Sequence, residues 1–311
     1  MHADEVPTDV ALVHRLLAAQ FPHWAGLPIE PFPSSGTVNA VYRLGDDMAV
    51  RLPRIEGGVE DLAKEQRWLP SLAPQLPVPI PVVLGAGTPA EGYPWPWSVY
   101  RWLDGAHPEA GHLTEPELLA TDLADFVLAL RRIDATDGPP AYRSGPLSAH
   151  DDGARAAIAR LRELGGLIDT EAATAAWEAS LRAPEWDGPP VWLHSDLMPG
   201  NLLVEGVHGA DGANGANGAD SGRLSGVIDF GTVGVGEPAS DLIPAWNLLP
   251  AGVRDGFRTA LDADDATWAR GRGWALLMAL NQLPYYLHTN PPLAANARHV
   301  ITEVLADQAT S

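Results

Sequence analysis

The apolar residues of this chain change their spacing at Asp104-Gly105, and this change constrains the fold more than any other feature. Before it, short apolar runs typical of strands alternate with two segments at helical spacing. The predicted strands are residues 38–44, 48–52, 82–86 and 97–102, and the predicted helices are residues 7–20, with Thr8 as N-cap, and 60–72. Gly45-Asp46-Asp47 between the first two strands is typical of a hairpin.

After Gly105 the pattern is mainly helical. The predicted helices are residues 115–132, 154–164, 170–182, 239–249, 253–261, 267–287 and 293–307, and two strand-like runs lie at 202–205 and 224–230. We therefore predict an α+β, bilobal fold. A small β-rich N-terminal lobe would comprise residues 1–103, and a larger, mostly helical C-terminal lobe would comprise residues 104–311.

The composition excludes several classes of function. The chain has 20 basic and 40 acidic residues, a formal net charge of -20 and no cysteine. The acidity argues against a nucleic-acid partner, because phosphate binding needs clustered Lys and Arg. The lack of cysteine excludes disulfides and thiol nucleophiles. Residues 1–10 do not resemble a signal sequence, and no window reaches the roughly 18 apolar residues of a spanning helix. We expect a cytoplasmic protein without a membrane partner, and a monomer by default.

The strongest local signal is the run His-Ser-Asp-Leu-Met-Pro-Gly-Asn at residues 194–201, with Ile-Asp-Phe-Gly at residues 228–231. Phosphoryl transfer needs a carboxylate that orients and deprotonates the attacking hydroxyl, and oxygen ligands that hold Mg²⁺ against a triphosphate. Asp196 suits the first role, as catalytic base. Asn201, through its amide oxygen, and Asp229, through its carboxylate, suit the second, as metal ligands.

Other interpretations of these residues stay open. His-x-Asp or Asp-Phe-Gly alone occurs by chance in turns, and only the joint pattern indicates a phosphotransferase. A metallohydrolase would also use His194, Asp196 and Asp229, but it would need further histidines, and only His208 is near. His208 lies in residues 206–222, a stretch rich in Gly, Ala, Asn and Asp. We expect this stretch to be a mobile hairpin insertion without a chemical role.

The motifs resemble those of the aminoglycoside phosphotransferase family, and the resemblance extends over nearly the whole chain. Residues 194–201 match the family's His-x-Asp motif with Asn at the fifth position after the Asp. Residues 229–231 match its Asp-Phe-Gly-like motif, and residues 237–242 match its Glu-Pro-x-x-Asp-Leu segment. The resemblance implies a bilobal protein-kinase-like fold, in which His194 and Asp241 support the catalytic loop.

The same resemblance implies roles in the first lobe. In the Ser-Ser-Gly-Thr-Val-Asn run before the hairpin, Ser35 and Thr37 would reach the nucleotide phosphates, together with backbone N–H groups. Arg51 stands in the place of the lysine that grips the α- and β-phosphates, and an arginine keeps the charge and binds phosphate bidentately. Glu65, on the following helix, is its expected partner. Lys64, the chain's only lysine, would face solvent.

Residues 97–105 resemble the hinge between the lobes of such kinases. Backbone groups of Arg101 and Leu103 would bind the edge of the purine. Tyr100 falls at the gatekeeper position, where a tyrosine favours GTP in some aminoglycoside kinases, or it is a core tyrosine that says nothing about the base. The nucleotide is therefore ATP or GTP.

The acceptor site has the weakest signal in the sequence. The resemblance places it between the catalytic loop and the C-terminal helices. The main candidates are Glu237, Trp246 and Tyr285, and the others are Asn247, Trp274, Asn281, Gln282 and Tyr286. Residues 283–300 contain no Asp or Glu, which does not favour a polycationic aminoglycoside. The Arg-Leu-Pro-Arg run at residues 51–54 also resembles macrolide phosphotransferases, whose acceptor pocket is more apolar.

The resemblance implies a phosphotransferase that moves the γ-phosphate of ATP or GTP onto a hydroxyl of a small molecule, with Mg²⁺ as cofactor. An aminoglycoside or macrolide type of antibiotic is the expected acceptor, and the role would be either antibiotic resistance or metabolism. A kinase of another metabolite and a nucleotide-binding pseudokinase are the alternatives. Intact Asp196, Asn201 and Asp229 favour an active enzyme. A protein kinase is disfavoured, because no long segment ending in Ala-Pro-Glu follows Gly231.

Overall fold

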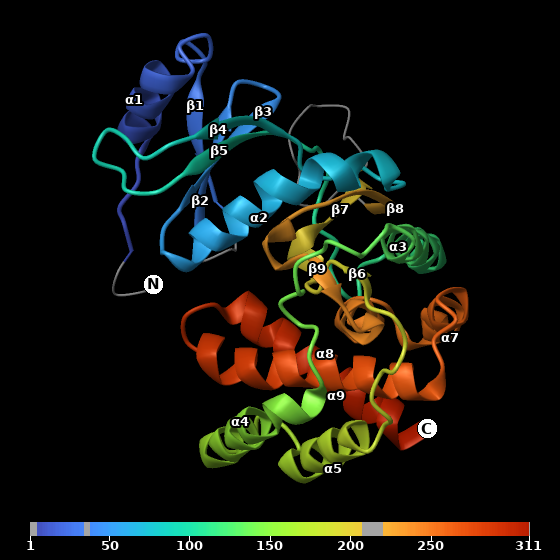
Figure 1. Cartoon of the computed structure of the whole chain (residues 1–311). Helices are drawn as coiled ribbons and strands as arrows, with labels where there is room; N and C mark the ends of the chain where they lie inside the picture. The colour runs from blue at the N-terminus through green and yellow to red at the C-terminus, as the bar shows by residue number, and fades with distance from the viewer. Residues whose placement is uncertain (1–4, 34–37, 207–219, 311) are drawn as a thin grey trace. The chain divides into compact units, whose positions relative to one another are not determined.

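The computed structural model describes residues 5–33, 38–206 and 220–310, and the chain forms two compact units (Figure 1). The first unit comprises Met1–Gly105 and Ser225–Thr232, and the second comprises Ala106–Leu224 and Val233–Ser311. The first boundary follows Gly105, and residues 225–232 group with the first unit.

An antiparallel five-stranded sheet forms the body of the first unit, in the order β1-β2-β3-β5-β4. Its strands are β1 (Ile29–Phe32), β2 (Asn39–Leu44), β3 (Met48–Pro53), β4 (Val83–Gly87) and β5 (Trp97–Arg101). The predicted hairpin joins β2 and β3, with Leu44 opposite Met48. Gly45 in its turn has a φ of 59°, which glycine adopts without strain.

Two helices accompany this sheet. α1 (Val10–Gln20) buries four leucine and valine side chains in one cluster with residues of β2, β3 and β5. Its N-cap is Asp9, whose carboxylate accepts from the amide of Leu12 at 2.7 Å, so the predicted cap at Thr8 is wrong. α2 (Gly57–Leu72) contacts β3 and β4 and buries Glu65 together with three leucines.

The second unit is mainly helical. Its longer helices are α3 (Pro116–Arg131), α4 (Asp151–Leu164), α5 (Thr170–Leu181), α7 (Ala251–Ala260), α8 (Asp265–Tyr286) and α9 (Pro291–Thr310). Between Arg270 and Leu280, α8 is buried around its whole circumference, which is typical of a helix inside a core. Contacts with α4, α5 and α9 surround it (Figure 1).

Short strands flank the candidate catalytic loop. β6 (Val191–Leu193) pairs with β9 (Gly234–Gly236), and β7 (Leu202–Gly206) pairs with β8 (Asp220–Val227). β6 ends directly before His194, and β7 begins directly after Asn201. The predicted helix at 239–249 is divided into a 3₁₀ helix, η5 (Pro238–Leu242), and α6 (Pro244–Asn247), because Pro244 has no N–H to continue a helix and starts a new one.

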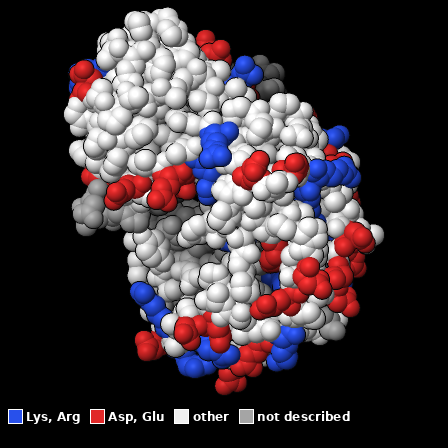
Figure 2. All heavy atoms as spheres, viewed as in Figure 1, with Lys and Arg blue, Asp and Glu red and all other residues white. Residues whose placement is uncertain are grey.

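The observed α+β architecture in two units confirms the predicted fold class. On the face shown in Figure 2, acidic and basic side chains occur in small groups among uncharged residues. Within the described part of the chain, none of the helices combines the length and the apolar content needed to cross a membrane.

Candidate active site

The loop that follows β6 in the second unit has a constrained backbone. Ser195 has a φ of 61°, a left-handed value that costs a non-glycine residue about 1 kcal/mol. Two successive amides offset this cost, since His194 N and Ser195 N donate to Asp241 Oδ2 and Oδ1 at 2.9 and 2.7 Å. The left-handed residue thus brings both amides onto one carboxylate and fixes the position of Asp196, which follows.

Asp241 lies on η5 and is completely buried. Burial raises the pKa of this carboxyl, while His194 and the two amides oppose the rise. Both carboxylate oxygens accept a hydrogen bond from the loop. Asp241 therefore supports the loop from inside the unit and has no surface to offer to a substrate.

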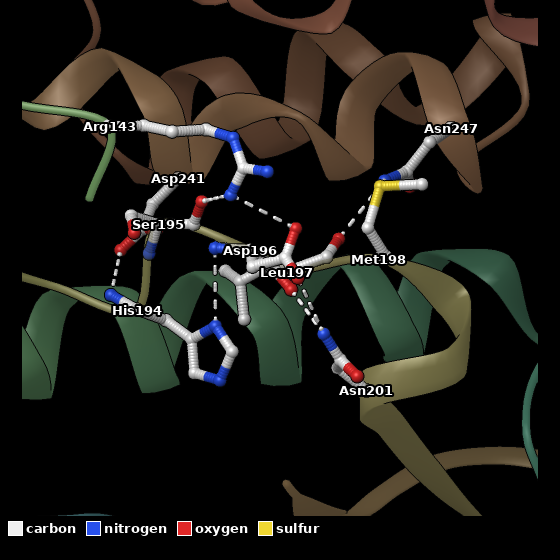
Figure 3. Close-up of polar contacts among 9 residues, drawn as sticks. All are labelled: Arg143, His194, Ser195, Asp196, Leu197, Met198, Asn201, Asp241 and Asn247. Atoms are coloured by element: carbon white, nitrogen blue, oxygen red, sulfur yellow. Dashed lines mark hydrogen bonds and ion pairs between the residues drawn. The ribbon is translucent and has the colours of Figure 1, made fainter. Parts of the chain in front are cut away.

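Asp196 is partly exposed, with 22% of its side chain accessible. Its Oδ1 lies 3.2 Å from Nη1 of Arg143, and its Oδ2 accepts from Nδ2 of Asn201 at 3.1 Å. Figure 3 shows these two side chains pointing at the carboxylate from opposite sides. The same Nδ2 donates to the Asp196 carbonyl at 2.8 Å. The carboxylate therefore has a fixed orientation and remains accessible.

Arg143 and Asn247 also hold the loop, and sequence reasoning did not assign either residue to it. Arg143 donates to the carbonyl of Ser195 at 2.7 Å, and Nδ2 of Asn247 donates to the carbonyl of Leu197 at 3.0 Å. Both act from elements outside the motif, 52 and 50 residues away along the chain. No spacing rule in the sequence points to such distant contacts.

The three main acceptor candidates lie in different environments. Trp246 is completely buried and packs on Trp268 with 4.6 Å between ring centroids, so it belongs to the helical core and offers no surface to a ligand. Tyr285 on α8 is 56% exposed. Of the three candidates, it alone has a largely exposed side chain.

Glu237 is 8% exposed, and its carboxylate is engaged within the unit. Oε1 accepts from Trp274 Nε1 at 3.0 Å, and Oε2 pairs with Arg270 Nε at 3.1 Å. Oε2 also accepts from the amide of Ala239 at 3.3 Å. Glu237 therefore holds the start of η5 against α8, and its charge is already neutralised by an arginine.

In the first unit, Arg51 on β3 is the centre of a buried charge network. Nη1 donates to Oε1 and Oε2 of Glu65 at 2.8 and 3.0 Å, and Nη2 donates to Oδ1 of Asp229 at 2.7 Å. With its carboxamide oxygen facing the guanidinium, Asn39 accepts from Nη2 at 2.8 Å and from Nε at 3.1 Å. Burial alone would lower the pKa of Arg51, but the carboxylates of Glu65 and Asp229 outweigh it and raise the pKa.

Tyr100 and Arg101 lie on β5, and each forms a hydrogen bond within the first unit, Tyr100 through its side chain and Arg101 through its backbone. Tyr100 is buried and donates from its hydroxyl to Oε2 of Glu65 at 2.6 Å. Burial, together with the charge of Glu65, raises its pKa well above the ordinary value, so the hydroxyl keeps its proton. The amide of Arg101 donates to the carbonyl of Val82 at 2.9 Å. A contact of Arg101 with a purine stays a prediction. Leu103, the other predicted hinge residue, is partly buried.

Asp229 follows β8 with a φ of 64°, and 47% of its side chain is exposed. Gly231, in the next 3₁₀ helix, lies so close to α2 that an added Cβ would be 2.7 Å from Cβ of Asp61. Glycine is required here by this close approach. Asp61 is partly buried, and burial together with the charge of Asp229 raises its pKa to about 6.

Asp61→Asn is expected to increase the free energy of unfolding at neutral pH by about 1 kcal/mol, after allowance for solvent screening. The pKa of this carboxyl rises from 3.8 to about 6 on folding, so its contribution to stability is complete below pH 3.8 and is lost as the pH rises through 6. The gain should therefore be present above pH 6 and vanish towards pH 3.8. Denaturant titrations of both proteins across this range measure it, and a gain independent of pH would contradict the raised pKa.

Asn201 in the second unit and Asp229 in the first have donor atoms that suit Mg²⁺, which prefers oxygen ligands. Among the described residues, no hydrogen bond is formed by Oδ1 of Asn201 or Oδ2 of Asp229, so each residue has an oxygen to offer. A metallohydrolase would need a denser set of ligands. Residues 5–33, 38–206 and 220–310 contain no group of three or more His, Asp or Glu side chains able to hold a metal.

Some of the predictions fall outside the described residues. Ser35 and Thr37, the expected phosphate contacts, lie there, and so do His208 and most of the Gly- and Asn-rich insertion. Their roles stay predictions from the sequence.

Arg51→Ala is expected to raise the nucleotide KM and to lower kcat, since the resemblance implies that both binding and alignment of the phosphates depend on Arg51. It should also lower the free energy of unfolding by about 3 kcal/mol, because Glu65 is left buried without its counter-charge. Arg51→Lys should recover only part of the loss, since an ammonium does not reproduce the fork that contacts Glu65 and Asp229.

Lys64→Ala is the matched control for Arg51→Ala, because it removes a nearby cation that is not part of the network. Steady-state kinetics of the two alanine variants, measured side by side, should show a mild effect of Lys64→Ala. A severe effect of Lys64→Ala together with a mild effect of Arg51→Ala would assign the phosphate contact to Lys64.

Comparisons with known proteins support the same family. A model of the phosphotransferase enzyme family matches residues 29–274. The solved GDP and kanamycin complex of APH(2")-IIIa is 19% identical, with a TM-score of 0.70 over 95% of this chain and 98% of that chain. The GDP complex of wild-type aminoglycoside 2'-phosphotransferase-IIIa is 18% identical, with a TM-score of 0.71 over 97% and 100%. The macrolide 2'-phosphotransferase MphH from Brachybacterium faecium is 23% identical, with a TM-score of 0.59 over 95% and 98%. A search of curated proteins found no match.

At these identities the solved structures show that the fold is shared. It is the kinase-like fold of the aminoglycoside phosphotransferases, as the motifs predicted.

Proposed function

This chain belongs to the phosphotransferase enzyme family, and we propose that it moves the γ-phosphoryl group of ATP or GTP onto a hydroxyl of a small molecule. The observation that carries this proposal is the carboxylate of Asp196, which is accessible and is held on one oxygen by Arg143 and on the other by Asn201. A general base needs this combination of fixed orientation and access to the hydroxyl proton. Asp241 adds rigidity by holding the backbone of the loop.

In the proposed reaction, Asp196 orients the acceptor hydroxyl and takes its proton as the oxygen attacks the γ-phosphorus. The bond from the γ-phosphorus to the bridging oxygen of the nucleotide breaks, and a nucleoside diphosphate leaves. Apart from the proton that Asp196 takes, the loop forms no covalent bond. Its contribution is to position the reacting hydroxyl, which is the main source of catalysis in phosphoryl transfer.

Arg51 is the proposed contact for the nucleotide phosphates. All three nitrogens of its guanidinium already have protein partners, so a phosphate oxygen binds by replacing one of them. Asp229 is the partner best placed to be replaced, because its side chain is 47% exposed while that of Glu65 is fully buried. By the motif resemblance, Asn201 and Asp229 would each supply an oxygen ligand for Mg²⁺, which would neutralise charge on the β- and γ-phosphates.

We propose a hydroxylated antibiotic as the acceptor, and a macrolide type ahead of an aminoglycoside. The solved structures that share the fold include a kanamycin complex and a macrolide phosphotransferase. A polycationic aminoglycoside needs free carboxylates, and the candidate carboxylate of Glu237 is already paired with Arg270. The base itself is in contact with an arginine, which disfavours a cationic group beside the reacting hydroxyl.

A coupled nucleotide-turnover screen tests this proposal, with ATP and GTP offered separately in the presence of Mg²⁺. The acceptors are macrolides, aminoglycosides and small hydroxylated metabolites. We expect turnover with an antibiotic, and faster turnover with macrolides than with aminoglycosides. Turnover with metabolites alone would show that the acceptor is a metabolite and not an antibiotic. Nucleotide binding without turnover would indicate a pseudokinase.

A further inference from the structure

Arg143 lies outside the recognised motifs, in the irregular segment between α3 and a 3₁₀ helix, η2 (Leu147–His150). Among the described residues it is the basic side chain that forms an ion pair with Asp196. Figure 3 shows its guanidinium over the loop, directed at the carbonyl of Ser195 and at the carboxylate of Asp196. Both contacts come from one nitrogen, Nη1, at 2.7 and 3.2 Å.

The fold holds this segment firmly against β9. The amide of Ala141 donates to the carbonyl of Val235 at 3.0 Å, and the amide of Val235 donates to the carbonyl of Pro139 at 2.7 Å. The two glycines of β9 permit this approach. An added Cβ would lie 2.4 Å from the Ala141 amide at Gly234 and 2.2 Å from Cβ of Ser144 at Gly236. Contacts on both sides of Arg143 thus set its place relative to β9, the strand that pairs with β6.

We propose that Arg143 is a positioning residue for phosphoryl transfer, an inference that rests on the proposed function. It holds Oδ1 of Asp196 while Asn201 holds Oδ2, so the carboxylate cannot rotate about its terminal bond. It also ties this carboxylate to the carbonyl of Ser195, the left-handed residue of the loop. The carboxylate and the strained backbone are therefore kept in one arrangement by a single guanidinium.

An ordinary surface ion pair would contribute little to stability. Arg143 differs from such a pair in two respects. Its side chain and that of Asp196 are only 18% and 22% exposed, and one of its two acceptors is a backbone carbonyl of the loop. The expected effect of its loss is therefore on the geometry of the base, where a displacement of about 1 Å lowers the rate on the order of 10²-fold.

The test compares Arg143→Ala with Arg155→Ala, a matched loss of an arginine in the same unit. Arg155 on α4 pairs with Asp151 and Glu178, whose side chains are 34% and 45% exposed, and these pairs lie outside the loop and β9. Arg143→Ala should lower kcat on the order of 10²-fold and leave the nucleotide KM within about twofold of wild type. Arg155→Ala should keep wild-type kinetics. Added guanidinium should restore part of the activity of Arg143→Ala, whereas urea, which has the same shape and no charge, should not.

Arg143→Lys provides a second variant that keeps the charge, and it should retain more activity than Arg143→Ala. A wild-type kcat in Arg143→Ala would overturn the inference. A lower kcat that is accompanied by a lower melting temperature, and that guanidinium does not restore, would overturn it as well. Inactivity of the wild type and Arg155→Ala toward every acceptor would instead refute the proposed function. In that case, crystal structures of the wild type and Arg143→Ala decide the inference, which requires Asp196 to lose its single orientation in the variant.

Discussion

Asp196→Ala is expected to lower kcat on the order of 10²-fold or more and to leave nucleotide affinity nearly unchanged. In the proposed reaction the carboxylate orients the hydroxyl and takes its proton, and both effects act mainly in the transition state. Asp196→Asn keeps the shape of the side chain but cannot accept the proton, so it should be similarly impaired. Steady-state kinetics give kcat, and calorimetry gives the nucleotide affinity.

Asp169→Ala is a suitable control for Asp196→Ala, because it removes an aspartate from the same unit. Asp169 caps α5 by accepting from the amides of Glu171 and Ala172, away from the loop. Its loss should lower stability by about 1 kcal/mol and should not affect kcat. If Asp196→Ala retained most of the wild-type activity, Asp196 would not be the base.

Asp229→Asn is expected to abolish turnover and to weaken the binding of the Mg²⁺-nucleotide. Mg²⁺ prefers a carboxylate oxygen as ligand. The amide oxygen of asparagine carries no negative charge and would therefore bind Mg²⁺ more weakly. The substitution also removes one of the two carboxylates that neutralise Arg51. Calorimetric titration with nucleotide, at several Mg²⁺ concentrations, should show that the Mg²⁺ dependence of binding is lost.

Asp46→Asn is the corresponding control, since Asp46 is exposed in the turn between β2 and β3. It should bind nucleotide as the wild type does. Unchanged Mg²⁺-dependent binding in Asp229→Asn would exclude Asp229 as the metal ligand.

The fold was largely predictable because most of its helices and strands are long enough to show the regular spacing of apolar residues that is typical of each. The hairpin of β2 and β3 and the helices from α3 to α9 lie close to the predicted ranges for this reason, apart from the segment divided at Pro244. β1, β6 and β9 were not predicted, because strands of four, three and three residues are too short to show a period of two.

Two sets of contacts at the candidate site were predictable where the resemblance names both partners, and the roles of these residues stay predictions. The pair of Arg51 and Glu65 is present with two hydrogen bonds, and the amides of the loop at His194 and Ser195 reach Asp241. The contacts of Arg143 were not predictable, because they depend on how an irregular segment packs against the glycines of β9. Burial was equally hard to foresee. Trp246 reads as a candidate for ligand binding by its type and position, but tertiary packing places it in the core.

The same limit applies to backbone groups. Arg101 occupies the hinge position that the resemblance assigns to purine binding, and its amide is paired with the carbonyl of Val82 in the segment before β4. Tyr100 is buried, and its hydroxyl contacts Glu65 on α2. The first partner depends on how β5 lies beside β4 and the second on how α2 packs, and a single sequence specifies neither.

The transfer of a labelled γ-phosphoryl group tests the central claim most directly. Wild-type protein and Asp196→Ala are each incubated with Mg²⁺, γ-labelled ATP or GTP, and a panel of macrolide, aminoglycoside and metabolite acceptors, and the acceptors are then recovered and analysed by mass spectrometry. The account predicts that the label appears as a phosphate ester on a hydroxyl of one acceptor class, and that its rate of appearance falls on the order of 10²-fold in Asp196→Ala. Label that remains on the nucleotide or appears only as free phosphate with every acceptor, at equal rates in both proteins, would contradict it.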